Sequence, residues 1–182
     1  MTTDRPLYDP KFIVEDGALS ILLFDVPWLE VTDARKECFM ATPTRSYTYG
    51  AGRGVRTYES IPPILFVQHI QLKLNEQWGT AFNGCFLNRY DDASKQLGWH
   101  ADDSPGMDHE HPIAVISFGE SREIWWRANG QTGVVPVDQR QLLSHGSLFM
   151  MPASFQQTHQ HRIPKGDRPM GKRVSLTYRR FL

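Results

Sequence analysis

The sequence predicts a mainly β fold of the α+β class, an antiparallel sandwich or barrel with flanking helices. Short runs of β-branched and aromatic residues recur along the chain, and most are bounded by Gly, Pro, Asn or Asp. No helical pattern separates each run from the next, which argues against an alternating α/β sheet. With 182 residues, 40% of them hydrophobic, the chain can bury the core of one domain.

Nine runs are predicted as strands, because each is short and lies between turn residues. They are FIV from residue 12, SILLF from 20, AFNGCFLNRY from 81, IAVISFG from 113, REIWWR from 122, GVVPV from 133, GSLFMMP from 146, QTHQHRI from 157 and RVSLTYRRF from 173. The adjacent Trp125 and Trp126 should face opposite sides of their strand. YTYGAGRGVR from residue 47 is Gly-rich, aromatic and basic, and predicts a loop or hairpin.

Two segments have the character of helices. PWLEVTDARKECFM starts with Pro27, and proline is favoured at the first position of a helix. PPILFVQHIQLKLNEQW places apolar residues at helical spacing until Gly79 ends the pattern. Both helices are expected to flank one sheet.

Charge and cysteine content restrict the binding partners and the cellular compartment that we expect. Twenty basic and twenty acidic residues cancel, so no global field attracts nucleic acid or an anionic membrane, and any nucleic-acid contact must be local. Cys38 and Cys85 lie far apart and indicate no disulfide framework. The N-terminus has no apolar leader, and no window is long and apolar enough to cross a membrane. We therefore expect a soluble monomer in a reducing compartment, cytoplasmic or nuclear.

A histidine and an aspartate stand two positions apart in LGWHADDSP, residues 97 to 105. On an extended segment such residues face the same way, so His100 and Asp102 can present a nitrogen and a carboxylate oxygen to one point. The late strand THQHRIP offers His159 and His161 as a third ligand. Two histidines and one carboxylate on one side of a metal form the facial triad of non-haem Fe(II) oxygenases. The alternative is an ordinary polar pair where a strand meets a loop.

Arg173 and Arg179 are six residues apart on the last predicted strand, which places both on one face. Two guanidinium forks on one face suit a small dicarboxylate. At about 3.3 Å per residue their Cα atoms stand about 20 Å apart, so the side chains must lean toward each other. Arginines at a surface edge are the alternative.

Six motifs occur in a characteristic order. They are NRY from residue 88, WHADD from 99, ISFGESR from 116, HGSLFMMP from 145, THQHRIP from 158 and RVSLTYR from 173. Together they resemble the AlkB family of 2-oxoglutarate- and Fe(II)-dependent dioxygenases, most closely the branch that repairs alkylated bases. Each motif alone is weak, whereas the ordered set is specific.

The resemblance covers roughly residues 41 to 181 and implies a double-stranded β-helix (jelly-roll) core with flanking helices. Residues 1–40 are expected to form an N-terminal extension packed on this core. The oxygenase domain is expected over residues 41–182, within one structural unit.

The resemblance also implies the iron ligands, which are His100, Asp102 and His161. His161 is preferred to His159 because Ile-Pro follows it after one residue, as in the family pattern.

The cosubstrate residues are implied in the same way. Asn88 and Tyr90 would hydrogen-bond 2-oxoglutarate. Arg173 would pair with its far carboxylate, and Arg179 would lie near the carboxylate that chelates iron. Read alone, NRY indicates a turn at the end of a strand with a core tyrosine.

SYTYG matches the Tyr-x-aromatic motif of the repair members, which hold a flipped base between an aromatic ring and an iron-binding histidine. Tyr49 would then stack on the base and Tyr47 would form a pocket wall. N1-methyladenine and N3-methylcytosine are cationic, and a cation over an aromatic face gains about 0.5 to 2 kcal/mol. Asp103 would add to this preference. A half-buried hairpin is the alternative for both tyrosines.

Two features depart from close repair relatives. Ser104 stands where those relatives often carry a glutamate that touches the base, which leaves base selectivity open. The loop GAGRGVR contains no large apolar wedge of the kind that a duplex invader uses. Arg53 and Arg56 instead favour contact with the backbone of a single strand or a loosened duplex.

The implied function is oxidative demethylation of N-alkylated nucleobases, such as N1-methyladenine and N3-methylcytosine, in single-stranded or locally melted DNA or RNA. The reaction would use Fe(II), O2 and 2-oxoglutarate and release formaldehyde, succinate and CO2. One alternative is an oxygenase of the same fold that acts in RNA modification, on a protein or on a small molecule, which the neutral net charge favours. A non-catalytic jelly-roll binding module is the other, and the arginine pair argues against it.

Overall fold

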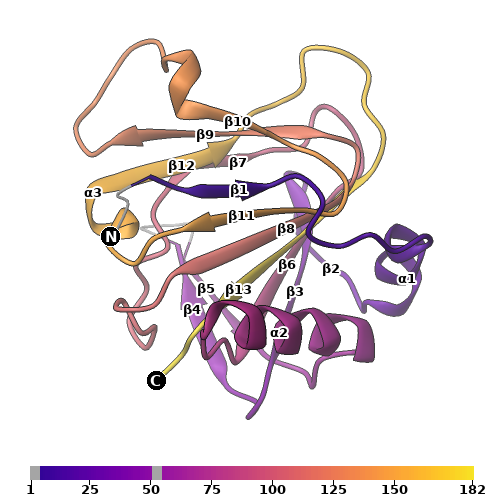
Figure 1. Cartoon of the computed structure of the whole chain (residues 1–182). Helices are drawn as coiled ribbons and strands as arrows, with labels where there is room; N and C mark the ends of the chain where they lie inside the picture. The colour runs from indigo at the N-terminus through magenta and orange to yellow at the C-terminus, as the bar shows by residue number, and fades with distance from the viewer. Residues whose placement is uncertain (1–4, 51–54) are drawn as a thin grey trace.

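The computed structural model describes residues 5–50 and 55–182. Two antiparallel sheets of these residues face each other (Figure 1). The larger is seven-stranded, in the order β1 (Leu7–Asp9), β11 (Ser147–Met151), β8 (Ile113–Gly119), β13 (Arg173–Arg179), β6 (Gly84–Tyr90), β3 (Arg35–Ala41) and β2 (Leu29–Thr32). The smaller is four-stranded, in the order β10 (Arg140–Leu143), β9 (Arg122–Ala128), β12 (His159–Ile163) and β7 (Leu97–His100). The predicted mainly β, jelly-roll fold is confirmed.

Helices and a hairpin surround the two sheets. The hairpin consists of β4 (Ser46–Tyr49) and β5 (Arg56–Glu59), as the Gly-rich segment predicted. The helices are α1 (Ala18–Asp25), α2 (Leu65–Trp78), the short α3 (Phe155–Thr158) and a 3-10 turn, η2 (Val137–Gln139). The prediction of α2 is confirmed, including its end at Gly79, whose φ of 62° lies in the left-handed region that glycine favours. No helix in the described part of the chain is long and apolar enough to cross a bilayer.

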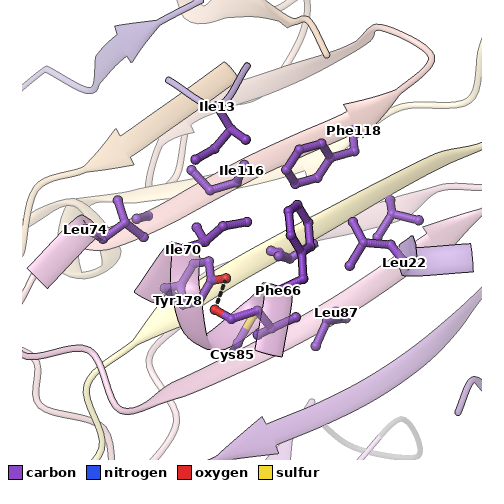
Figure 2. Close-up of a cluster of buried hydrophobic side chains, with 14 of the residues drawn as sticks. Ile13, Leu22, Phe66, Ile70, Leu74, Cys85, Leu87, Ile116, Phe118 and Tyr178 are labelled. Carbon is purple, nitrogen blue, oxygen red and sulfur yellow. Dashed lines mark hydrogen bonds between the residues drawn. The ribbon is translucent and has the colours of Figure 1, made fainter. Parts of the chain in front are cut away.

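One hydrophobic core lies between α1, α2 and the outer face of the large sheet (Figure 2). Ile70 and Leu74 of α2 and Leu22 of α1 are fully buried there. The Tyr178 hydroxyl of β13 donates to the Val67 carbonyl at 2.9 Å, so the hydroxyl of this buried tyrosine is satisfied. The helices thereby fix the back of the sheet whose front carries the site.

A second core fills the space between the two sheets, and it includes Phe86, Ile124 and Phe149. The side chains of strand β13 point alternately toward the helix-side core and toward the space between the sheets. Val174, Leu176 and Tyr178 belong to the helix-side core, whereas Arg173, Ser175, Thr177 and Arg179 line a cavity between the sheets.

Some predicted elements are wrong. PWLEVTDARKECFM is not a helix but forms β2 and β3, because β3 pairs with β6 from Lys36↔Arg89 to Ala41↔Gly84 and buries its last five residues. SILLF lies in α1 rather than in a strand, and FIV and GVVPV form no strand. Strand β3 runs across residue 40 to Ala41, and the N-terminal extension over residues 1–40, within one structural unit, stays a prediction.

Candidate active site

Strand pairing brings His100, Asp102 and His161 together. In the smaller sheet His100 of β7 stands opposite His161 of β12, and their ring centroids are 4.2 Å apart. Asp102 follows two residues after β7 ends. Its two carboxylate oxygens lie 3.8 Å from His100 Nε2 and 3.9 Å from His161 Nε2. One ligand atom from each residue therefore lies within 4.8 Å of the other two, which is the arrangement of a three-ligand metal site.

The protonation of these groups suits metal binding. Burial would raise the pKa of the Asp102 carboxyl, but Arg179 and the two histidines hold that pKa below its usual range. Burial lowers the pKa of His100. Burial also lowers the pKa of His161 to about 3, and the positive charge of a protonated His100 adds to this shift. His100 Nδ1 donates to the Gly98 carbonyl at 2.8 Å, which leaves the lone pair on Nε2. Near neutral pH the cluster therefore offers two imidazole nitrogens and a carboxylate.

Arg173 and Arg179 both point into the cavity beside this cluster. Arg179 Nη2 donates to Asp102 Oδ1 at 2.7 Å, and Arg173 Nη2 donates to Ser117 Oγ at 2.7 Å. Within the described residues, Nε and Nη1 of each arginine are buried without a hydrogen-bond partner. Burial lowers the pKa of Arg173 to about 10, so it stays protonated at neutral pH. Two buried cations with unused donors indicate an anionic ligand.

The expected metal ligands and cosubstrate residues all line one cavity between the sheets. Its lining consists of Arg35, Tyr47, Tyr49, Phe86, Asn88, Tyr90, Leu97, His100, Asp102, Val115, Ile124, His161, Ile163, Arg173, Ser175, Thr177 and Arg179. The Tyr90 ring lies 5.2 Å from the Arg173 guanidinium carbon. The cavity is thus apolar along its walls and cationic at both ends of β13.

Arg35 is a cavity residue that sequence reasoning missed. Its Nε donates to Asn88 Oδ1 at 2.8 Å, and its Nη2 forms an ion pair with the buried Glu37 at 2.5 Å. Glu37 also accepts a hydrogen bond from the Tyr58 hydroxyl at 2.6 Å. This network connects the β4–β5 hairpin to the cavity. Because a helix was predicted over this segment, the strand alternation that places Arg35 and Glu37 on one face was missed.

The two tyrosines of the hairpin strand differ in position. Tyr47 is buried against Phe39, Phe86 and Phe181, with ring centroids 5.2 to 5.9 Å away. Tyr49 is only partly buried, and its ring meets His100 edge to face at 5.9 Å. Tyr49 therefore stands beside the His-Asp-His cluster, whereas the buried Tyr47 forms part of the cavity lining.

Asp103 and His159 lie outside the cavity. The side chain of Asp103 is exposed and lines a separate polar hollow with His109, Gln157 and Gln160. His159 does not belong to the cluster of His100, Asp102 and His161. Its ring stacks on Phe155 with centroids 4.6 Å apart. The expectation for Arg53 concerns a residue outside the described ranges.

The comparisons decide the family. A family model described as the 2OG-Fe(II) oxygenase superfamily matches residues 30–179. The chain belongs to this superfamily. The family implies Fe(II), 2-oxoglutarate and O2, and the site fits them, because the three clustered donors suit Fe(II) and the unused guanidinium donors suit a dicarboxylate.

This oxygenase is similar to several curated proteins. It is 30% identical to rat alpha-ketoglutarate-dependent dioxygenase alkB homolog 3, over 90% of this chain and 59% of that protein. It is also 30% identical to the human DNA oxidative demethylase ALKBH2, over 78% of this chain and 58% of that protein. The chain thus spans about three fifths of the length of these relatives.

The fold of the oxygenase also resembles a solved structure. The structure of OsALKBH1 matches with a TM-score of 0.60 at 16% identity, covering 99% of this chain and 98% of that one. The likeness agrees with the jelly-roll arrangement of the two sheets.

Proposed function

We propose that this oxygenase demethylates N-alkylated nucleobases, such as N1-methyladenine and N3-methylcytosine, in DNA or RNA. The observation that carries the proposal is a His-Asp-His cluster beside two buried arginines with unused donors, under the edge of Tyr49. The similarity to proteins named as DNA oxidative demethylases supports the choice of substrate class.

In this proposal His100, Asp102 and His161 hold the iron. When bound, Fe(II) with 2-oxoglutarate and O2 supplies the oxidising power that converts an N-methyl group to formaldehyde, with succinate and CO2 as co-products. The protein keeps the ligand set ready, because Arg179 holds Asp102 in its ionised form. A set of three protein ligands leaves coordination positions for the cosubstrate and O2.

The cosubstrate is held by the arginines and the strand-end residues. Arg173 pairs with the far carboxylate of 2-oxoglutarate through guanidinium donors that have no partner in the described structure, while Ser117 Oγ accepts a hydrogen bond from Nη2. Asn88 accepts a hydrogen bond from Arg35, which orients its amide so that the N–H donors can serve the ligand. Arg179 lies near the carboxylate that binds iron.

The methylated base would enter over Tyr49. A cationic base gains about 0.5 to 2 kcal/mol over an aromatic face, and stacking on Tyr49, whose ring lies beside His100, would bring its methyl group toward the proposed metal ligands. Burial raises the pKa of the Tyr49 hydroxyl, so the ring stays neutral at the pH of the reaction. Asp103 is exposed just outside the cavity, where its carboxylate adds negative charge near a bound cationic base.

The test is mass spectrometry on a panel of methylated DNA and RNA oligomers incubated with the full chain, Fe(II), 2-oxoglutarate and O2. We expect one oligomer class to lose the mass of one methylene and formaldehyde to appear in equal amount. Asp102→Ala should abolish both signals, whereas His69→Gln, a change at an exposed histidine on α2, should leave both intact.

Two results would contradict the proposal. In the first, no methylated oligomer raises succinate output while a protein or small-molecule substrate does, which would favour the oxygenase of different substrate class. In the second, the protein binds metal but turns over no 2-oxoglutarate, which would favour a binding module.

A further inference from the structure

The outer face of the smaller sheet carries a row of alternating arginines and tryptophans that the site does not use. We call it the Arg–Trp ladder, and its members in order are Arg127, Trp99, Arg162, Trp125 and Arg140. From each guanidinium carbon to the neighbouring ring centroid the distances are 4.2, 5.5, 5.7 and 4.4 Å along the row. All five side chains keep part of their surface open to solvent.

Strand alternation puts the ladder on the outside. Trp126 of β9 packs inward against Phe149 with ring centroids 5.7 Å apart, so its neighbour Trp125 faces outward, as the sequence predicted for adjacent tryptophans. Arg162 of β12 stands opposite Trp125, and Arg140 of β10 stands opposite it from the other side. The ladder therefore crosses the sheet from strand to strand.

The ladder carries positive charge without a matching carboxylate. Among the described residues, Arg127, Arg140 and Arg162 form no ion pair. The acid next to the row, Glu123, accepts a hydrogen bond from Trp125 Nε1 at 2.6 Å. Arg162 Nε is buried with no hydrogen-bond partner in the described structure. Three cations on a partly exposed face thus lack an anion.

The stacking of guanidinium groups on the tryptophan rings indicates which class of anion the ladder can bind. The tryptophan faces are already covered by guanidinium groups, so they offer little room for a nucleobase. Arg127 Nη2 donates to Gln160 Oε1, and Arg140 Nε and Nη2 donate to the Val135 carbonyl, so both guanidinium groups are held over their rings. Their remaining N–H groups can pair with a phosphate. The ladder therefore suits a phosphate backbone rather than bases.

We propose that the Arg–Trp ladder binds the sugar–phosphate backbone of a single-stranded nucleic acid whose alkylated base occupies the cavity. The proposal rests on the proposed function and extends it to the strand beside the lesion. Trp99 directly precedes His100 on β7, the edge strand of its sheet, so the two side chains face opposite sides of this edge and a bound strand would pass around it from the ladder to the cavity. One end of the ladder, Arg140, borders a hollow of about 560 Å³ that also contains Lys165, Arg168, Glu123 and Asp167.

The first test measures binding without catalysis. A labelled fifteen-nucleotide oligo-dT is titrated with the full chain by fluorescence anisotropy at several NaCl concentrations. Arg127→Gln/Arg140→Gln should lower the slope of log K against log salt by about 1.4, since each single-strand phosphate contact contributes about 0.7. The control Lys11→Gln/Lys73→Gln removes two charges beside Phe12, where Lys73 binds the Phe12 carbonyl, and should leave the slope unchanged. Arg127→Lys/Arg140→Lys keeps the charge and should keep most of the slope while weakening binding.

The second test uses turnover. With N1-methyladenine at the centre of a trimer and of a fifteen-mer, the wild type should show a lower KM for the longer substrate. The Arg127→Gln/Arg140→Gln variant should lose this advantage and treat the trimer as the wild type does, and a melting curve confirms that it is folded.

Other outcomes are decisive. The ladder is excluded if both double variants change the salt slope equally, or if neither does. Polyglutamate that competes as well as oligo-dT would assign the face to an acidic protein partner. If no methylated oligomer is demethylated, the proposed function fails, while the oligo-dT slope still decides on the ladder.

Discussion

At Arg173, one hydrogen bond to Ser117 serves a guanidinium that carries five N–H donors. The side chain is fully buried, and Nε and Nη1 find no acceptor among the described residues. Unmet buried donors of this kind are costly unless a ligand accepts them. The residue is therefore poised for an anion, and its geometry as well as its charge should matter.

Arg173→Lys keeps the charge but removes the planar fork, so we expect the KM for 2-oxoglutarate to rise by about 30- to 100-fold, which corresponds to about 2 to 3 kcal/mol. Succinate formation measured against 2-oxoglutarate concentration gives this value. Arg168→Lys, an exposed arginine that pairs with Glu120, is the matched control and should leave KM unchanged. An unaltered KM in the Arg173 variant would contradict the assignment of this residue.

The buried His161 makes the stability of the metal-free protein depend on pH. Its pKa is about 3 in the folded chain against an ordinary 6.5, so the unfolded state binds more protons between these values. Stability should therefore fall as pH drops below about 6.5, with a slope of up to about 1.4 kcal/mol per pH unit. Urea midpoints taken in chelator between pH 7.5 and 4.5 measure the slope. His161→Gln should flatten it, whereas His69→Gln should not.

Part of the site could be predicted residue by residue from the sequence, because strand alternation fixes which side chains share a face. His100 and Asp102, like Arg173 and Arg179, have even spacings, and the structure brings all four to one cavity. Arg35 escaped prediction because its role depends on pairing between β3 and β6, strands some fifty residues apart in the chain. No local pattern encodes such a partner.

At the scale of elements, a buried side-chain hydrogen bond adds to the packing of Tyr47 on Phe39 and Phe86 that attaches the β4–β5 hairpin to the large sheet. The Tyr58 hydroxyl of β5 donates to Glu37 of β3, and both residues are buried. Because β4 carries Tyr49, this bond helps to hold the aromatic side of the site in place.

Tyr58→Phe leaves Glu37 with one fewer donor, and we expect it to destabilise the fold by about 1 to 3 kcal/mol. The KM for a methylated oligomer should rise, while the KM for 2-oxoglutarate stays the same. Thr57→Val removes an exposed hydroxyl on the same strand, whose partner is Thr48, and serves as control. If both variants behave alike, the buried bond does not position the hairpin.

The elements that the sequence predicted well are those whose burial follows a local rule. IAVISFG became β8 and RVSLTYR became β13 because central strands favour continuous β-branched and aromatic runs. SILLF is equally apolar, yet it is helical in α1, where Leu22 is buried and Phe24 is 85% exposed. In β3 the helix-favouring residues Arg-Lys-Glu form a strand, since Arg35 neutralises Glu37 and the antiparallel pairing with β6 supplies the backbone hydrogen bonds. Tertiary contacts override local preference in both cases.

At the scale of the whole molecule, ligand binding should be linked to global stability, because the site joins strands of both sheets. Mn²⁺, used as a redox-inert substitute for iron, together with 2-oxoglutarate at 100 times its Kd should add about 2.7 kcal/mol. For a chain of this length that raises Tm by about 5 to 10 °C. Thermal unfolding with each ligand alone and with both measures the effect. A shift from Mn²⁺ that 2-oxoglutarate does not increase would contradict the cosubstrate site.

The contact between Arg179 and Asp102 also bears on which ions the proposed metal site would accept. Arg179 occupies Oδ1 at 2.7 Å, whereas Oδ2 is buried without a hydrogen bond in the described structure. Of the two oxygens, Oδ2 is thus the one that no donor in the described residues occupies. Calcium ions prefer six to eight oxygen ligands and often take both oxygens of a carboxylate, whereas first-row transition ions accept imidazole nitrogen and a single oxygen. At the proposed iron site, we therefore expect this single guanidinium to favour a transition ion over calcium.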